Sequence, residues 1–371
     1  MNFDFQILLD AIGLVQGVTV GILLIAMSTK NFRSCFYLGF FLLLYSLELA
    51  TWISVNTKIS EIYPELFLLP FNFSWILFPL FYLYTQQVSV FSNEKIKYWL
   101  LYPGIVSILA QIIIFWLPFE TKQIIEESTW HVIIFWVLGN YYSWFIGIWN
   151  LRLLYRHRIE VLNSYSYISF KELQWARFFL IYLLITSVFG HVIAYVLPTS
   201  FEDNTIFSVM DLIAIYWASY YGITQRNVRS LITNNWTEDN PKDQAAGTNY
   251  SPEIIPERLE EVMHAITDYM NASECYINPE LTIMDLAEGL NQHPKLVSEA
   301  INTVGKLNFN SYINQYRIKK AEALLKNDKT MNLSVEGIGI EVGFKSKSAF
   351  YSAFKKFTGT TPTSFKANQA A

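Results

Sequence analysis

The chain has 371 residues, a net charge of −4 and an apolar fraction of 52%. These averages hide two unlike parts: the first 222 residues hold 49 aromatic and 25 charged residues, whereas the rest holds 13 aromatic and 33 charged residues. So many aromatics exclude a disordered chain, and the two cysteines, Cys35 and Cys275, are too few for a disulfide scaffold. The first part therefore does not have the composition of an ordinary soluble domain.

Seven apolar segments in this first part are predicted to cross a membrane. A helix needs about 20 predominantly apolar residues to span the hydrocarbon core. The segments cover residues 5–27, 36–53, 66–84, 99–117, 132–149, 178–197 and 206–221. The first lacks the basic start and the cleavage site of a signal peptide. The expected fold class is thus all-α, beginning with a seven-transmembrane-helix bundle over residues 1–225.

The basic residues in the connecting loops predict the orientation of this bundle. Eleven Lys and Arg residues fall in one set of loops, and only Lys58 and Lys122 fall in the opposite set. Because cytoplasmic loops carry the excess of positive charge, the N-terminus is expected outside and the C-terminal part in the cytoplasm. The predicted location is the bacterial cytoplasmic (inner) membrane, and an odd number of spans agrees with termini on opposite sides.

Four polar residues are expected in the outer half of the bundle: Glu48, Asn72, His191 and Asp211. Ionisable groups inside a membrane are costly and often functional. One interpretation is a site, open to the outside, for a small-molecule ligand. The other is that these residues pair across helices, for instance Glu48 or Asp211 with His191, and hold the bundle together. The sequence leaves both open.

Three glycines, Gly13, Gly17 and Gly21, share one face of the first predicted helix. Small residues at this spacing let helix backbones approach closely, either inside the bundle or between two copies of the chain. The first part contains neither a metal-binding His/Cys cluster nor a recognisable nucleophile motif. We therefore expect no cofactor, no metal and no enzymatic activity.

The chain beyond the bundle begins with a predicted juxtamembrane segment and flexible linker, residues 226–255, rich in Asn, Asp, Pro, Gly and Thr. Charge is then segregated, because residues 230–289 carry a net −10 and residues 290–371 a net +7. A concentrated positive charge is typical of nucleic-acid binding, although a basic face also suits anionic lipid.

Apolar spacing in residues 256–371 predicts two pairs of short helices, each joined by a tight turn, at about 281–303 and 333–357. Ala287 and Gly339 hold the small position in the first helix of each pair. A long helix is predicted between the pairs, over residues 309–326. Its length of about 27 Å suits two helices that enter successive major grooves roughly 34 Å apart.

Residues 276–366 resemble the DNA-binding domain of the AraC/XylS family of transcription regulators. The matching stretches are the L-T-x-x-D-L-A start at residues 281–287, YRIKKAEALL at 316–325, VGFKSKSAF at 342–350 and FKKFTGTTP at 354–362. The resemblance implies an AraC-type domain with two helix-turn-helix units. It further implies a double-stranded DNA operator and RNA polymerase as partners, and regulation of transcription, as by an activator.

The resemblance also assigns DNA-contacting positions. The family's base-reading positions correspond to Lys295, Leu296, Ser298, Glu299, Lys347, Ser348, Tyr351 and Ser352. The expected phosphate contacts are Lys306, Lys319, Lys320, Lys355 and Lys356. Glu299 and Ser352 depart from the family's usual residues; a carboxylate at position 299 would accept a hydrogen bond from cytosine N4 rather than donate to guanine.

The two parts together predict a membrane-anchored one-component transcriptional regulator. A signal sensed in or outside the membrane would control DNA binding by the cytoplasmic domain. Because a flexible linker transmits strain poorly, homodimerisation is the expected route of control. The alternative is a membrane transporter or channel with a basic regulatory tail, which predicts transport without the tail and inverted repeats in the membrane part.

Overall fold

A computed structural model describes residues 5–28, 33–168, 172–196, 205–224, 256–326 and 333–369. The predicted linker, residues 226–255, lies outside them. The chain divides into two compact units, of which the first runs to His157 and resumes at Leu173. The second unit holds Arg158–Glu172 together with the C-terminal domain. The described residues are helical throughout, apart from turns, loops and a single antiparallel bridge between Tyr165 and Thr282.

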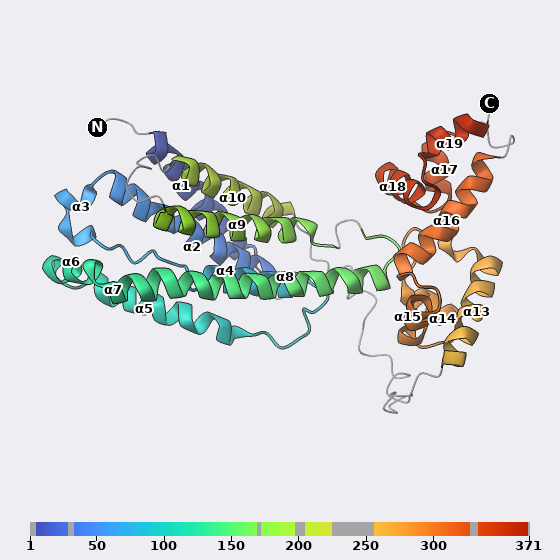
Figure 1. The fold of residues 1–371 in the computed structure, drawn as a ribbon, viewed down its shortest axis with the longest axis horizontal. Coiled ribbons are helices and arrows are strands. Elements are labelled where there is room, and N and C mark those ends of the chain that lie inside the picture. The colour runs from blue at the N-terminus through green and yellow to red at the C-terminus, as the bar shows by residue number, and fades with distance from the viewer. Residues whose placement is uncertain are drawn as a thin grey trace. The chain divides into compact units, whose positions relative to one another are not determined.

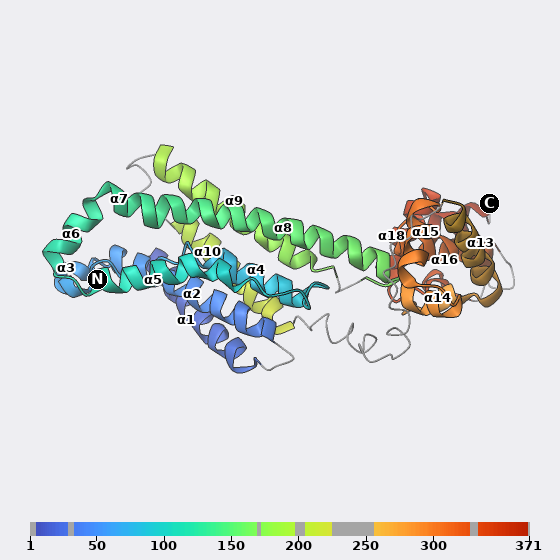
Figure 2. The ribbon, with the colours of Figure 1, turned by 90° about the horizontal axis from the view of Figure 1, so that it is seen from below.

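The first unit is a bundle of apolar helices (Figures 1 and 2). Its elements are α1 (Phe5–Ala26), α2 (Arg33–Asn56), α3 (Ile59–Ile62), η1 (Pro64–Leu66), α4 (Leu77–Val88), η2 (Tyr98–Leu101), α5 (Tyr102–Phe115), α6 (Phe119–Glu127), α7 (Thr129–His131), η3 (Val132–Leu138), α8 (Gly139–Ser164), α9 (Gln174–Val196) and α10 (Thr205–Thr224). The last turns of α8, from Arg158 on, belong to the second unit. Six described helices are long and apolar enough to cross a membrane, the longest being Thr129–Ser164, which joins α7, η3 and α8.

The third predicted span, residues 66–84, does not form a helix of spanning length, so the count of seven is not confirmed. Only Leu77–Val88 is helical there, and all twelve residues of this helix are buried. The preceding residues include Pro70, which lacks a backbone N–H, and Asn72 and Ser74, whose side chains compete for backbone hydrogen bonds. Composition alone identified an apolar segment but not this break.

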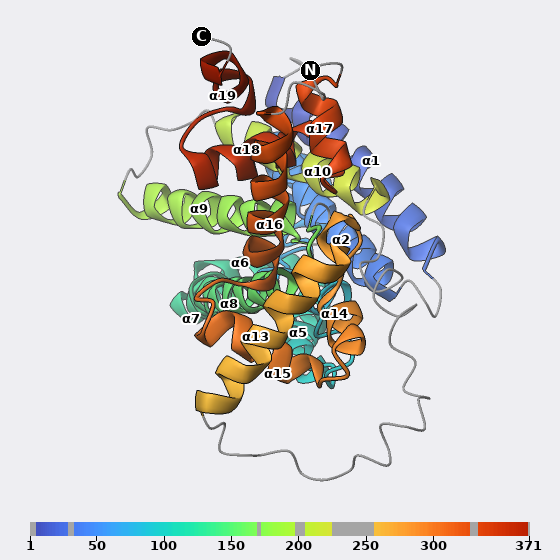
Figure 3. The same ribbon diagram turned by 90° about the vertical axis from the view of Figure 1, so that its right-hand side faces the viewer.

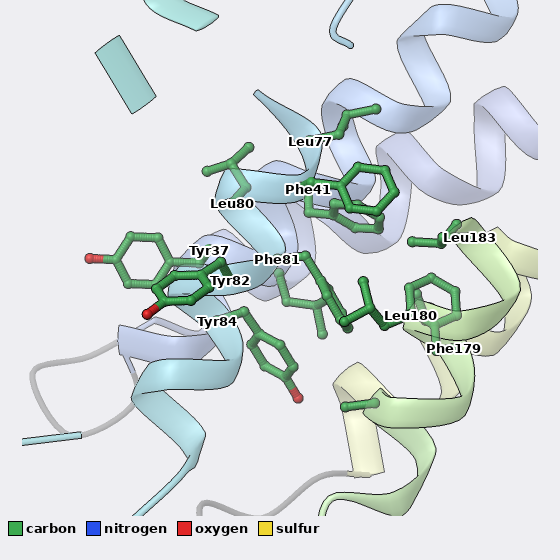
Figure 4. Close-up of a cluster of buried hydrophobic side chains, with 14 of the residues drawn as sticks. Tyr37, Phe41, Leu77, Leu80, Phe81, Tyr82, Tyr84, Phe179, Leu180 and Leu183 are labelled. Atoms are coloured by element: carbon green, nitrogen blue, oxygen red, sulfur yellow. The ribbon is translucent and has the colours of Figure 1, made fainter. Parts of the chain in front are cut away.

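The buried α4 lies at the centre of the bundle core. Phe81 of α4 packs between Phe41 of α2 and Phe179 of α9, with ring centroids 5.5 and 5.3 Å away (Figure 4). All three rings are at most 1% exposed. A helix surrounded in this way faces protein on every side, which explains why it is apolar all round.

The predicted glycine face of α1 packs inside the bundle. A Cβ added at Gly17 would lie 2.5 Å from the Cβ of Ser46 in α2, and one added at Gly21 would lie 2.9 Å from the carbonyl oxygen of Gly39. The two backbones therefore approach closely at Gly21 and Gly39, as small residues allow.

The second unit contains α13 (Pro256–Ser273), η4 (Cys275–Ile277), α14 (Ile283–Gly289), α15 (Pro294–Thr303), α16 (Phe309–Leu325), α17 (Val335–Glu341), α18 (Lys347–Thr358) and α19 (Pro362–Gln369). Figure 3 shows α16 between α14–α15 on one side and α17–α18 on the other. Its N-terminal half belongs to a hydrophobic cluster with α13, α14 and α15, and its C-terminal half to a separate cluster with α17 and α18.

Side-chain caps set where the helices of the second unit begin. Thr282 and Asp285 form a reciprocal capping box at α14, with Thr282 N donating to Asp285 Oδ2 over 2.8 Å. Ser334 accepts from Gly337 N at the start of α17 and Ser346 from Ala349 N at the start of α18. Gly359, with φ +78°, ends α18 in the left-handed conformation.

Replacing Gly21 by Leu tests the close packing of α1 and α2. The added side chain meets the Gly39 carbonyl and the backbone of Leu43, so we expect a loss of about 1–3 kcal/mol in unfolding free energy from overpacking. The measurement is thermal unfolding of the full chain in detergent. Val15→Leu, at a position of α1 that is 66% exposed, is the control, and equal stability of the two variants would contradict the packing.

Candidate functional site

The predicted DNA-contacting residues of α15 divide between surface and core. Lys295 is exposed, and Ser298 and Glu299 are half-buried. Leu296, in contrast, is 7% exposed and packs in the first hydrophobic cluster. A side chain that packs in this core is turned away from a base edge, so Leu296 is left out of the base readout proposed below. The resemblance gave the position of Leu296 in the motif but not the side of the helix on which it lies.

The predicted residues of α18 form a polar group around Glu336 of α17. Lys347 Nζ lies 2.6 Å from Glu336 Oε1, and the Tyr351 hydroxyl donates to the same oxygen over 3.2 Å. The hydrogen bond from Lys347 lowers the pKa of Glu336, and in return raises the pKa of Lys347. Ser348 and Ser352 are exposed on the same helix. Both titrating groups are thus charged at neutral pH.

The five predicted phosphate contacts are lysines at or near the surface of the second unit. Lys306, Lys319, Lys355 and Lys356 are exposed, and Lys356 Nζ donates to Ser311 Oγ over 3.1 Å. Lys320 is half-buried and pairs with Glu274 over 2.6 Å. Four of the five are thus open to solvent, and Lys320 is held by a carboxylate.

Arg317 of α16 was not singled out from the sequence, although it lies inside a matching motif. It is 2% exposed, and its Nε and Nη2 donate to the carbonyl oxygens of Tyr276 and Asn278 over 2.7 and 2.8 Å. Burial lowers its pKa to about 10, so it stays charged at neutral pH. The sequence signal was an arginine beside Ile313 and Ile318 on the apolar side of a long helix.

Three of the four predicted polar residues of the bundle line one cavity of about 750 Å³: Glu48, Asn72 and Asp211. Its walls include Tyr45 and the aromatic side chains of Phe41, Trp52, Trp136 and Phe207. His191 is not among the lining residues; its Nδ1 lies 3.4 Å from Asn140 Nδ2 and its ring packs edge-on against Trp144. An apolar cavity with a few convergent polar groups is typical of a ligand site.

The polar residues of this cavity also hold the non-helical stretch before α4. Glu48 Oε1 accepts from Phe73 N over 2.6 Å, and the Gln111 side-chain amide bonds both the N–H and the C=O of Asn72, over 3.0 and 2.8 Å. Asp211 Oδ1 accepts from the Tyr45 hydroxyl over 2.6 Å. Non-helical backbone at membrane depth persists only where protein or a cavity satisfies it, and these side chains do so.

Comparison with known families places a known kind of domain in the second unit. Residues 286–368 match the model of a helix-turn-helix domain family. The C-terminal part of this chain carries a helix-turn-helix domain. The model covers neither the bundle nor α13, so the family match does not extend to the first unit. Among the described residues, no group of three or more His, Cys, Asp or Glu side chains is placed to hold a metal ion.

Similar proteins include regulators of operons. The chain is 31% identical over 112 residues to the Msm operon regulatory protein of Streptococcus mutans, covering 29% of this chain and 39% of that protein. It is 34% identical over 87 residues to the melibiose operon regulatory protein of Escherichia coli, covering 23% and 28%. An uncharacterized HTH-type transcriptional regulator of Escherichia coli is 28% identical over 109 residues, covering 29% and 36%. The chain thus spans at most 39% of the length of these relatives. No solved structure shows a significant match.

Two substitutions of Glu48 test its role as a backbone acceptor. Glu48→Leu leaves the Phe73 N–H without its partner, so we expect a loss of about 1–3 kcal/mol in unfolding free energy. Glu48→Gln keeps an acceptor oxygen and should lose much less. Thermal unfolding of the full chain in detergent measures both. If the two variants were equally stable, the hydrogen bond to residue 73 would not be what the carboxyl contributes.

Proposed function

We propose that this protein is a membrane-anchored one-component transcriptional regulator. Its apolar helices anchor it in a bacterial cytoplasmic membrane, and its C-terminal domain binds operator DNA and regulates transcription. The observation that carries the proposal is the helix-turn-helix match over residues 286–368, in the same chain as six helices apolar enough to cross a membrane. Relatives named as operon regulatory proteins support the transcriptional role.

In this proposal α14–α15 and α17–α18 are two helix-turn-helix units, and α15 and α18 are the recognition helices. Lys295, Ser298 and Glu299 read bases from α15. The base-reading residues of α18 are Lys347, Ser348, Tyr351 and Ser352. The 17 residues of α16 separate the units by about 26 Å, a spacing that suits successive major grooves. Leu296, being buried, has no part in this readout.

In this proposal the five lysines bind DNA phosphates, and a phosphate can replace Glu274 as the partner of Lys320. Lys306, Lys319, Lys320, Lys355 and Lys356 would release counterions when they meet phosphate. Glu274, the partner of Lys320, has an exposed side chain, and exposed ion pairs contribute little to stability. RNA polymerase is the proposed partner at the promoter, where the regulator acts as an activator, and a homodimer would engage repeated sites.

The proposed topology keeps the N-terminus outside and the DNA-binding domain in the cytoplasm. The segment before and including α4 would then cross the membrane as a part-extended, part-helical span. Twelve helical residues cover about 18 Å, and the non-helical residues before them, at about 3.3 Å each, cover the remainder of a core about 30 Å thick.

The cavity at Glu48, Asn72 and Asp211 is the proposed sensing site for a small molecule. Its aromatic walls and the half-buried carboxyl groups of Glu48 and Asp211 suit a ligand with an apolar body and a hydrogen-bonding head. His191 lies beside Asn140 rather than on the cavity wall, so we assign it no contact with the ligand.

DNA binding is tested with a fragment that starts at Pro256. We expect this fragment to bind duplex DNA with an affinity that falls steeply as salt rises. Lys355→Ala should weaken binding to all sequences alike and reduce the salt slope by roughly 1, as the loss of one phosphate contact does. Lys326→Ala, at another exposed lysine, is the control. A fragment without salt-dependent DNA affinity would contradict the proposal. If the fragment binds DNA, crosslinking the full chain to DNA in cells identifies the operators.

The topology is tested by labelling single cysteines with a membrane-impermeant maleimide, after Cys35 and Cys275 are changed to Ser. Lys58→Cys, between α2 and α3, should react in intact cells. Lys95→Cys, between α4 and η2, should react only after the membrane is opened. Both positions are exposed, so differences in reactivity report the side of the membrane. The reverse pattern would invert the proposed orientation.

A further inference from the structure

The segment that joins α8 to α9 belongs, by its contacts, to the same compact unit as the helix-turn-helix domain. Tyr165 forms an antiparallel bridge with Thr282, and Ser166 N donates to the Leu281 carbonyl over 3.1 Å. Tyr165 is 9% exposed and Ser166 is 3% exposed. Both residues are therefore as buried as residues of a hydrophobic core. We call residues 165–167 the docking loop.

Side chains of α16 hold the docking loop by directed hydrogen bonds. Asn310 Nδ2 donates to the Ser166 carbonyl over 2.7 Å, and Arg317 Nη2 donates to Ser166 Oγ over 3.2 Å. The last turn of α8 takes part as well, since Leu162 lines the same small pocket as Leu307, which follows α15. The contact therefore combines a backbone bridge, polar side-chain bonds and apolar burial.

The docking loop also reaches the second helix pair. Lys345, in the turn between α17 and α18, lies with its Nζ 4.8 Å from the centre of the Tyr167 ring, a cation–π distance. The same ammonium pairs with Glu280, just before α14. One short loop thus contacts the start of α14, the middle of α16 and the turn before α18.

This position matters because the two helix pairs have separate cores that share only α16. Arg317 sits at the joint: it bonds the carbonyls of Tyr276 and Asn278 on the first side, and its guanidinium lies 5.6 Å from the Phe344 ring on the second. The docking loop contacts Arg317 through Ser166 and Lys345 through Tyr167, so it adds contacts on both sides of that joint. It therefore stabilises one mutual arrangement of α15 and α18.

We infer that the docking loop is a positioning contact that raises DNA affinity when docked, and that it links the membrane helices to the DNA-binding domain. The inference rests on the proposed function. If the two recognition helices are already held at the distance that DNA requires, the domain loses less conformational entropy on binding and therefore binds more tightly. The loop follows α8 and precedes α9 in the chain, and Arg158 and Glu172 join the two ends of its segment over 3.4 Å, so the chain connects the two units through this segment.

The first experiment asks whether the loop is docked in membranes. Tyr165→Cys and Thr282→Cys are combined in the full chain after Cys35 and Cys275 are changed to Ser. Opposed residues of an antiparallel bridge lie about 4.5–5.5 Å apart at Cα, within the range of a disulfide. Copper phenanthroline in air is the oxidant. We expect an intramolecular disulfide in this chain and none when Tyr165→Cys is combined with Asn271→Cys, at an exposed position of α13.

The second experiment measures the affinity of the full chain, in lipid nanodiscs, for a duplex carrying the site most enriched by crosslinking in cells. Asn310→Ala removes the donor to the loop, and we expect Kd to rise about three- to tenfold, the worth of a typical hydrogen bond. Asn271→Ala should leave Kd unchanged. Adding the 165–282 disulfide to Asn310→Ala should restore the affinity on oxidation and lose it again on reduction, which a merely structural role of Asn310 would not produce.

The outcomes separate the two proposals. Failure of residues 165 and 282 to crosslink, an unchanged Kd for Asn310→Ala, or a Kd that oxidation does not restore would each overturn the inference and leave the proposed function standing. Absence of DNA binding by the unsubstituted chain would overturn the proposed function, and this inference with it.

Discussion

The buried guanidinium of Arg317 is the interaction on which the arrangement of the C-terminal domain depends. A charge removed from water is tolerated only where hydrogen bonds replace its hydration, and here two carbonyls and a serine hydroxyl do so. The partners come from segments far apart in the sequence, so the arginine ties them to α16 at one point. Removing it would take the side-chain donor from the Tyr276 carbonyl and the link from α16 to the Ser166 hydroxyl.

The need to pair buried polar groups also explains the non-helical stretch in the bundle. The stretch before α4 leaves the helical path inside an apolar unit, and side chains of α2 and α5 supply the hydrogen bonds that a helix would have made internally. The carboxyl of Glu48 therefore has a structural use, whether or not a ligand also reaches it.

Much of this organisation follows from the sequence, and the exceptions have physical reasons. Helical periodicity located α13 to α18, since each helix buries one apolar face, and the resemblance located the helix-turn-helix domain. Hydropathy located the long helices of the bundle but not the break before α4, because bonds from Glu48 and Gln111 depend on neighbours distant in sequence. The burial of Leu296 could not be predicted for a related reason: a motif gives the order of residues, whereas packing decides which side chains point inward. The contacts of Ser166 with α16 left no trace in periodicity or composition.

The docking loop makes the C-terminal domain discontinuous in sequence. Part of it is encoded between α8 and α9, about 90 residues before α13 begins. Recombination in the linker would bring together a bundle and a domain whose loop and α16 had not changed in step. A substitution in the loop therefore needs a matching substitution on α16, although the two lie far apart in the sequence.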